Sequence, residues 1–391
     1  MKSIALALAL AAMAATANAA PVAKSPFPKP LPEEPIPLVE KLPAQWPSSV
    51  VLVHDFHFNA IVDGRVMVVD TASPQRPVRG VVRAAQFANM LVSPRRGEVL
   101  TSETFYSRLT RGERTDVVTL WDMATLQPKG EIVMPGGKRQ QSVTYPQLFQ
   151  FTNGEKWALV ANFTPAQSVS VLDLDARKVI AEIDLPGCAQ LYPTGERGFS
   201  SFCADGSLLS VTLGPDGQAV SSKTVENVQD IDNQPLFGTP AWVGRTAWFV
   251  SYRGQVQGFD FSGPVAKPIP GTFNVGTAEG AAPEWRPGGW QVIAADASGK
   301  LYILMSANGR EGSHKDGGSE VWVVDPAKKA RIARIPLKSV AVAIGLTKEA
   351  TPRLIAARAD GVVDVHDAAS GAFVHSLGSA GGANPIVITV P

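Results

Sequence analysis

Two histidines flank an aspartate near residue 55, and side chains of these types can hold a metal ion. The segment reads His54-Asp55-Phe56-His57, so it offers imidazole and carboxylate ligands within four residues. A zinc site needs three or four ligands that converge on one point. His54 and His57 are three residues apart on a strand or loop, need not face the same point, and have no obvious third ligand. We therefore expect no metal site here.

The rest of the sequence contains no recognisable catalytic motif. It lacks a Walker loop, a G-x-G-x-x-G fingerprint, a G-x-S-x-G elbow and an H-E-x-x-H pair. The 5 histidines are scattered, so the fold itself would have to assemble any catalytic triad. Most aspartates are explained by turns. These observations favour a scaffold, or one subunit of an enzyme, over a chain with its own active site.

The elements that would position such residues follow a repeated pattern. A short apolar strand ends in Asp, a turn of small residues follows, and a second apolar strand begins, as in residues 362–374. Alternating apolar residues on both sides of a tight turn predict a β-hairpin. Asp favours the turn because its carboxylate can accept hydrogen bonds from backbone N–H groups two residues further on. The apolar strand recurs from Val66, Val117, Val169, Leu208, Val256, Val321 and Val363.

About seven copies, spaced by roughly 40 to 65 residues, indicate a repeat architecture. With four short strands per copy and little helix, the simplest interpretation is a seven-bladed β-propeller. A β-sandwich of unrelated hairpins is the alternative, but it rarely needs so many copies. We predict an all-β, single-domain propeller of four-stranded antiparallel blades over residues 48–391. Its last strand, residues 385–390, should pair with strands near residues 50–53 and close the ring.

The composition agrees with this fold and limits the partners. The 391 residues are 45% hydrophobic and include 35 glycines and 31 prolines, which suits a large, turn-rich β-protein. The formal net charge is +1, so there is no electrostatic case for binding nucleic acid. No run of like charges suggests an anionic membrane surface.

The N-terminal 47 residues differ from the rest of the chain. Residues 1–19 have the features of a secretory signal peptide, with Lys2, an apolar stretch over residues 4–15 and an Ala17-Asn18-Ala19 cleavage site. The apolar stretch is too short for a membrane anchor, so we expect an exported, periplasmic protein. Residues 20–47 are rich in proline and predict an extended arm. That arm is either a disordered leader or a segment that lies on a partner subunit.

The two cysteines, Cys188 and Cys203, are expected to form a disulfide. They lie on apparent neighbouring strands of one blade, at hairpin spacing, in a chain that we expect to be exported. Closing a loop of about 15 residues would stabilise the fold by roughly 3 kcal/mol in the chain-entropy model. Their spacing is far from C-x-x-C, so a redox role is not expected.

Three further segments have distinctive compositions. Residues 107–116 read SRLTRGERTD and form either a solvated loop or an interface, in which Arg is enriched. Residues 285–291 read WRPGGWQ, a Pro-Gly turn flanked by aromatic residues, and predict a hairpin whose tryptophans fill gaps between blades. Residues 308–318 form a long polar loop, a place where binding function often lies.

Taken together and in order, these segments resemble the heavy subunit of periplasmic quinoprotein amine dehydrogenases. The resemblance rests on residues 107–116, on the cysteine pair with residues 186–188 and 203–208, and on residues 285–290, and it runs from about residue 50 to the C-terminus. The segments SYRG at 251–254 and GREGSHK at 309–315 are more similar to the aromatic amine dehydrogenase branch than to the methylamine branch.

The resemblance implies an α2β2 heterotetramer of heavy and light subunits. In this family the small, cysteine-rich light subunit carries tryptophan tryptophylquinone (TTQ), made from two of its own tryptophans. The quinone oxidises a primary amine to aldehyde and ammonia, and electrons pass to a blue copper protein such as azurin or amicyanin. The present chain would hold no cofactor or metal, would bind the light subunit, and would form part of the substrate channel.

The resemblance also assigns candidate channel residues. In the methylamine branch a Phe that follows a His in the first loop gates the amine channel, and His57-Phe58 occupies the corresponding place. The preceding Asp55 and Phe56 depart from the family pattern. A rigid aromatic side chain at a channel mouth can select substrate shape without transferring protons. The alternative is that Phe58 only packs between blades.

Two rival functions need no light subunit. A stand-alone periplasmic propeller could bind a partner or ligand without catalysis, but it has no reason to carry the ordered set of family motifs. A propeller hydrolase or lyase would need clustered acids or histidines that the sequence lacks.

Overall fold

A computed structural model describes residues 29, 31–32, 40–60, 62–141 and 145–391. The chain divides into two units, Met1–Val39 and Glu40–Pro391, and every strand that the structure describes belongs to the second. The predicted signal peptide, residues 1–19, lies outside the described residues. Residues 40–47 of the predicted arm belong to the second unit, where the Leu42 N–H donates to the Ala124 carbonyl over 2.7 Å and Trp46 Nε1 donates to the Met123 carbonyl over 3.3 Å.

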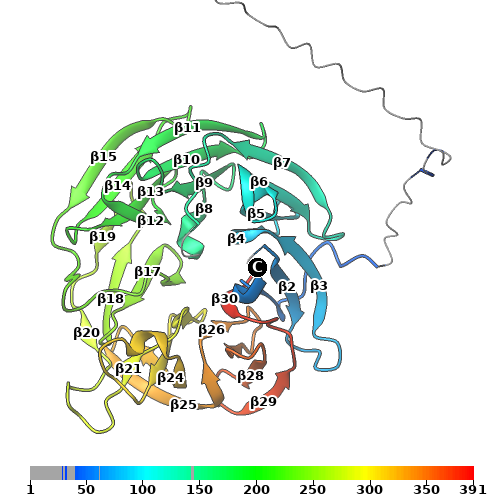
Figure 1. The fold of residues 1–391 in the computed structure, drawn as a ribbon. Helices are drawn as coiled ribbons and strands as arrows, with labels where there is room; N and C mark the ends of the chain where they lie inside the picture. The colour runs from blue at the N-terminus through cyan, green and yellow to red at the C-terminus, as the bar shows by residue number, and fades with distance from the viewer. Residues whose placement is uncertain (1–28, 30, 33–39, 61, 142–144) are drawn as a thin grey trace, which may run out of the picture. The chain divides into compact units, whose positions relative to one another are not determined.

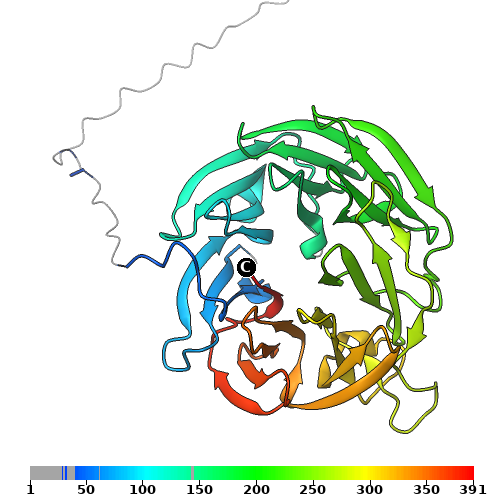
Figure 2. The ribbon, with the colours of Figure 1, turned by 180° about the vertical axis from the view of Figure 1, so that it is seen from behind.

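The second unit is a ring of seven antiparallel sheets, which confirms the predicted seven-bladed propeller (Figures 1 and 2). From the innermost strand outward, the first four blades are β30 (Pro385–Thr389), β1 (Val50–Asp55), β2 (Gly64–Asp70) and β3 (Val78–Ala84); β4 (Gln86–Ser93), β5 (Glu98–Arg108), β6 (Arg111–Asp122) and β7 (Pro128–Met134); β8 (Phe149–Thr152), β9 (Trp157–Asn162), β10 (Ser168–Asp173) and β11 (Lys178–Asp184); and β12 (Cys188–Pro193), β13 (Gly198–Cys203), β14 (Leu208–Leu213) and β15 (Ala219–Val225).

The remaining three blades follow the same order, and two of them have a strand in two pieces. They are β16 (Ala241–Val243), β17 (Thr246–Val250), β18 (Gln255–Asp260) and an outer strand split into β19 (Lys267–Pro268) and β20 (Phe273–Asn274); an inner strand split into β21 (Arg286–Pro287) and β22 (Ile293–Ala295), then β23 (Leu301–Ser306), β24 (Gly318–Asp325) and β25 (Ala330–Ala341); and β26 (Ala343–Leu346), β27 (Arg353–Ala357), β28 (Val363–Asp367) and β29 (Phe373–Leu377).

The repeated pattern of the sequence is the third strand of every blade with the turn after it. In the last copy the Ser370 N–H donates to the Asp367 carboxylate over 2.7 Å, and Asp122 and Asp173 accept backbone N–H groups in the same way. The degenerate fourth copy lacks Asp at its end, and Asp216 in the turn accepts the Gln218 N–H instead. The carboxylate therefore ends the strand and fixes the turn to the outer strand.

The predicted ring closure is also confirmed. β30 is the innermost strand of the first blade and pairs antiparallel with β1, Val53 lying opposite Ile388. In both ribbon views the C-terminal strand, in red, lies beside the N-terminal strands, in blue. The two ends of the propeller thus share one sheet, which leaves no gap in the ring.

The hydrophobic core lies between neighbouring blades. One cluster joins Leu159 and Val169 of the third blade to Leu191 and Phe199 of the fourth. Each such fully buried side chain stabilises the fold by about 1.5–3 kcal/mol, so stacking of the sheets determines the ring.

Two sequence predictions were wrong in detail. Pro287-Gly288-Gly289 does not form a hairpin turn, because β21 and β22 on either side of it pair with the same strand, β23. Gly289, at φ +137°, interrupts the innermost strand without reversing the chain. Residues 107–116 are not a simple loop, since they form the end of the long β5–β6 hairpin.

Three short 3-10 turns are the helical segments that the structure describes: η1 (Phe58–Ala60), η2 (Pro146–Leu148) and η3 (Ser313–Lys315). Within the described ranges, no helix is long and apolar enough to cross a membrane.

Candidate functional site

The propeller has two dissimilar faces, which follow from the strand order. On one face the second strand of each blade connects to the third and the outer strand connects to the next blade, and we call this the loop face. On the opposite face lie the turns between first and second strands and the Asp-led turns, and we call this the turn face. The predicted channel residues His57 and Phe58 lie on the loop face, in the connection between β1 and β2.

A buried carboxylate fixes the first loop. Asp55 is fully buried and accepts three backbone N–H groups, from His57 over 2.9 Å, Ala383 over 2.9 Å and Asn384 over 2.8 Å. Two of these donors come from the connection that precedes β30, more than 320 residues away along the chain. Asp55 therefore holds together the two chain segments that close the ring.

Phe58 is fixed by its backbone and exposed at its side chain. Its N–H donates to the Asn384 side-chain oxygen over 2.9 Å, while 48% of the residue is exposed. Its ring lies 6.2 Å from that of Phe56, measured between centroids. His57 has a left-handed backbone, at φ +47°, and its Nδ1 lies 3.3 Å from an Arg65 nitrogen. Phe58 thus faces outward from the loop face instead of filling a gap between blades.

His54 lies beneath this loop. It is buried and stacks on Phe56 with 4.1 Å between ring centroids. Burial, only partly opposed by the nearby Asp55, lowers the pKa of His54 to about 4, so its imidazole is neutral at pH 7. Across the described residues, no group of three or more His, Cys, Asp or Glu side chains could hold a metal ion.

The β5–β6 hairpin rises above the second blade on the same face. Its anchor is Asp116, which is buried and accepts the Thr104 hydroxyl over 2.7 Å and two Arg114 N–H groups over 2.9 and 3.0 Å. Asp116 also accepts the Arg139 N–H over 3.0 Å. The Arg139 side chain is buried, which lowers its pKa to about 10, and it donates to Thr104. The acidic end of the SRLTRGERTD segment is thus structural.

Two aromatic pairs form around the loop face, and the sequence segments that contain Trp290, Tyr252 and His314 did not predict either pairing. Tyr145 stacks on Trp290 with centroids 5.3 Å apart, and Tyr252 stacks on His314 with centroids 4.0 Å apart. Burial, with Tyr252 as the smaller cause, raises the pKa of the Tyr145 hydroxyl. Trp290 lies in the interruption between β21 and β22, and the other three residues come from three separate connections. No local pattern could therefore have brought them together.

Exposed apolar side chains distinguish the loop face from the turn face. Six of the large apolar residues that are exposed belong to connections or to the hairpin on the loop face: Phe58, Val62, Phe105, Leu109, Phe163 and Ile231. Six others lie on outer strands: Val133, Val220, Ile332, Val340, Phe373 and Val374. In the described part of the propeller, none lies in a turn of the turn face. The loop face therefore carries exposed apolar side chains from several connections, which the described turns of the turn face lack.

The predicted disulfide is confirmed. Cys188 and Cys203 lie opposite each other on β12 and β13 and are bonded. Cys203 borders a cavity of about 310 Å³ on the loop face, whose lining includes Phe202, Ile231 and Phe237. The disulfide therefore holds the two innermost strands of the fourth blade together next to this surface.

Solved structures of other proteins are similar to this chain in fold. A solved structure of a candidate 6-phosphogluconolactonase from Bacteroides fragilis superposes with a TM-score of 0.56 at 12% identity, covering 88% of this chain and 96% of that one. A dihydro-heme d1 dehydrogenase, NirN, gives a TM-score of 0.50 at 14% identity, covering 85% and 74% of the two chains. At these identities the likeness concerns the fold alone.

Sequence relatives are more informative. The methylamine dehydrogenase heavy chain of Methylorubrum extorquens is 30% identical over 344 residues, covering 87% of this chain and 82% of the relative. That of Paracoccus versutus is 28% identical over 357 residues, covering 90% and 82%. A family model described as methylamine dehydrogenase heavy chain matches residues 48–391, the whole predicted propeller. The chain therefore belongs to the methylamine dehydrogenase heavy chain family and is an amine dehydrogenase heavy subunit.

Proposed function

We propose that this chain is the non-catalytic heavy subunit of a periplasmic quinoprotein amine dehydrogenase, and that its loop face binds the light subunit. The observation that carries the proposal is the set of exposed apolar side chains on this face, from Phe58 to Ile231, in a chain of the heavy-subunit family. Burying such groups against a partner removes apolar area from water and drives association. Two copies of each chain would form an α2β2 complex.

The reactive group would belong to the partner. When bound, the TTQ of the light subunit supplies the oxidising power that converts a primary amine to aldehyde and ammonia, and a blue copper protein such as azurin or amicyanin takes the electrons. The described residues of this chain could form a wall of the substrate channel. The loop face offers aromatic side chains and fixed backbone, but its described residues include no group of metal ligands. Its contribution is to exclude water and to shape the path of the amine.

We assign the shape selection to Phe58 and the substrate class to aromatic amines. Phe58 is exposed on a loop fixed by Asp55 and Asn384, so its ring is displayed in a defined place. The half-buried pairs Tyr145–Trp290 and Tyr252–His314 present flat aromatic surface, which suits an aromatic substrate ring. The relatives named above are methylamine dehydrogenase heavy chains, so methylamine is the competing substrate in the assay.

The decisive experiment is purification from the native host, followed by a denaturing gel and an absorption spectrum. A small co-purifying chain with quinone absorbance that bleaches on addition of tyramine or phenylethylamine would support the proposal. Bleaching by methylamine alone would assign the protein to the methylamine branch and would overturn the proposed preference for aromatic amines. A single chain with no chromophore and no response to any amine would overturn the proposal in favour of a stand-alone binding propeller.

A Phe58→Ala variant of the same complex tests the shape selection. We expect kcat/KM for aromatic and small amines to change unequally, by about tenfold relative to each other, because the wall of the path loses one ring. Val62→Ala, an exposed apolar residue of the same loop, is the matched control. Unchanged kinetics and unchanged amine preference in Phe58→Ala would remove the assignment.

A further inference from the structure

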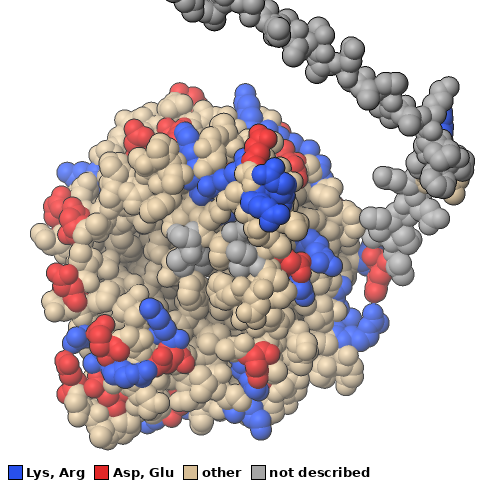
Figure 3. Space-filling model, in the orientation of Figure 1, with Lys and Arg blue, Asp and Glu red and all other residues tan. Residues whose placement is uncertain are grey.

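The β5–β6 hairpin ends in a two-stranded ribbon that extends beyond the other two strands of its blade. β4 pairs with β5 only as far as Thr104, and β7 pairs with β6 only from Asp116 onward. Residues 105–115 therefore continue without neighbouring strands, and at about 3.3 Å per residue the tip extends roughly 13 Å beyond the blade. In the view of Figure 3, positive side chains gather over the place of this hairpin in Figure 1.

The tip displays two guanidinium groups and a leucine side chain that are exposed to solvent. Arg108 and Arg111 are exposed, and no described residue forms a hydrogen bond or ion pair with either side chain. Leu109 lies between them and is 78% exposed, and Phe105 at the base of the ribbon is 45% exposed. By contrast, Arg114 at the base is held by Asp116 and by the Arg139 carbonyl.

The backbone of the tip is fixed in an uncommon conformation. Leu109 has a left-handed backbone, at φ +61°, which non-glycine residues avoid. Gly112 is at φ +99°, and a Cβ there would lie 2.3 Å from the Ser107 hydroxyl oxygen. That hydroxyl accepts the Glu113 N–H over 3.0 Å and fixes the turn. The turn therefore holds Leu109 in a defined and exposed place at the tip.

We propose that this tip, residues 108–111, is a prong that inserts into the light subunit, where two carboxylates border an apolar notch. The inference rests on the proposed function, because it names the part of the loop face that fixes the position of the partner. Guanidinium groups form bidentate, charge-assisted pairs with carboxylates, and they are hydrated weakly enough to be placed in interfaces. Leu109 fills the notch between them. The prong is continuous with the exposed apolar residues of the loop face, beginning with Phe105 at its base.

The test uses the full heavy chain co-expressed with its light subunit, and compares affinities by titration of the purified chains. Arg108→Glu/Arg111→Glu should weaken the complex on the order of 100-fold or more, since hot-spot arginines each contribute strongly to an interface. Leu109→Ala should weaken it by about tenfold. Lys156→Glu/Lys178→Glu, an equal charge change at exposed residues of the turn face, should leave the affinity unchanged.

The outcomes separate the two proposals. If the charge-reversed variant binds the light subunit as tightly as the wild type, the proposed role of the prong is wrong while the proposed function stands. If the wild-type chain binds no light subunit at all, the proposed function fails and the prong fails with it. If instead the wild type self-associates and Arg108→Glu/Arg111→Glu is monomeric, the occupant is a second copy of this chain and the proposal is overturned. Circular dichroism melting curves confirm that each variant is folded.

Discussion

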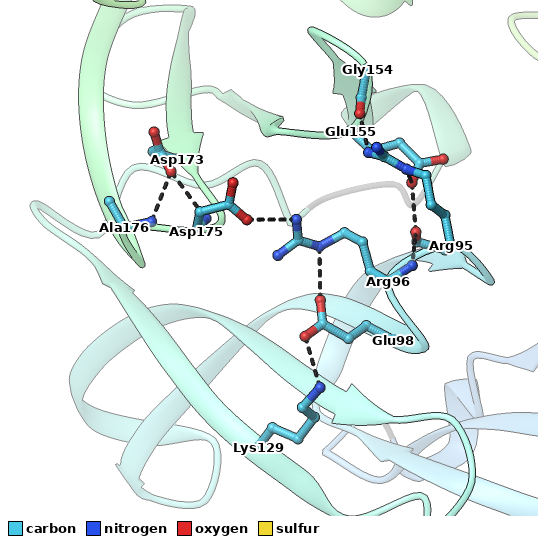
Figure 4. A network of polar contacts seen from close by, with 10 residues as sticks. Arg95, Arg96, Glu98, Lys129, Gly154, Glu155, Asp173, Asp175 and Ala176 are labelled. Carbon is cyan, nitrogen blue, oxygen red and sulfur yellow. Dashed lines mark hydrogen bonds and ion pairs between the residues drawn. The ribbon is translucent and has the colours of Figure 1, made fainter. Parts of the chain in front are cut away.

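The two ends of the second blade use arginine in opposite ways. At the turn face, Arg96 donates to Glu98 over 2.9 Å and to Asp175 of the third blade over 2.8 Å, and Arg95 donates to Glu155 over 3.2 Å (Figure 4). At the loop face, Arg108 and Arg111 have no partner in the described part of the chain. The same residue type therefore bridges blades at one end and remains available at the other.

The difference shows how a surface can be ordered and still be left free for a partner. On the turn face the ordering groups are at the surface, where ion pairs join one blade to the next. On the loop face, besides surface ion pairs such as Arg65–Asp63, two buried carboxylates lie beneath the segments that they fix: Asp55 fixes the first loop and Asp116 fixes the hairpin. The outer groups, such as Phe58 and Arg108, then need no partners within the chain.

The largest effect is expected at Asp55. Asp55→Ala leaves three backbone N–H groups without an acceptor, and each costs about 1–3 kcal/mol, so we expect a loss of about 4 kcal/mol in the free energy of unfolding. Denaturant unfolding measures it. Asp216→Ala, which removes a single acceptor in a turn-face turn, should cost about 1 kcal/mol or less. If the two variants lost equal free energies of unfolding, the proposal that the buried Asp55 carboxylate orders the loop face would be contradicted.

His54 predicts how the loop face responds to acid. Its pKa is about 4 in the folded chain and about 6.5 when unfolded, so the unfolded state binds the proton first. Stability is therefore complete above about pH 6.5 and is lost as the pH falls toward 4, by about 3 kcal/mol at 1.36 kcal/mol per pKa unit.

The measurement is the free energy of unfolding from pH 7 to pH 4 for the wild type and for His54→Gln. Carboxylates titrate in both proteins, so the difference between the two curves isolates the histidine. We expect that difference to shrink steadily below about pH 6.5. Parallel curves would show that His54 is not held neutral by burial.

The bridge at the turn face is expected to contribute less. Arg96 is 17% exposed at its side chain, and Arg96→Ala removes its hydrogen bonds to Glu98 and Asp175, while Lys129 remains on Glu98 at 3.0 Å. We expect a loss of about 2 kcal/mol, typical of charge-assisted bonds that are partly buried. Arg95→Ala removes a side chain that is 63% exposed and should cost less than about 1 kcal/mol. A larger effect for Arg95 than for Arg96 would contradict this ranking.

Local patterns in the sequence were enough to predict the blades. The pattern of strand, Asp and turn depends on neighbours along the chain, so the number of its copies predicted the seven blades. The hairpin spacing of the two cysteines likewise predicted the disulfide. The interruption at Gly289 was misread because a Pro-Gly-Gly segment can either reverse a strand or break it. Only the pairing of both flanking strands with β23 distinguishes the two.

The arrangement of the loop face could not be predicted in the same way. Asp55 binds donors more than 320 residues away, and Tyr145 meets Trp290 across the ring, so neither contact leaves a local signal. The alternation of charges in SRLTRGERTD likewise did not reveal which arginines are engaged. Arg114 lies two residues before Asp116 on β6 and therefore on the same face of the strand, whereas Arg108 and Arg111 lie beyond the reach of this carboxylate at the tip.

The smallest effect on stability is expected for the arginines at the tip of the β5–β6 hairpin, and it distinguishes the loop-face end of the second blade from its turn-face end. Arg108→Ala/Arg111→Ala removes two side chains without partners among the described residues, so the free energy of unfolding should stay within about 0.5 kcal/mol of wild type. Arg96→Ala, in the same blade, gives the matched comparison. If removing the prong arginines destabilised the isolated heavy chain as much as removing Arg96, they would have partners within the chain. Stability without these arginines means that any selection for them acts through something outside the chain.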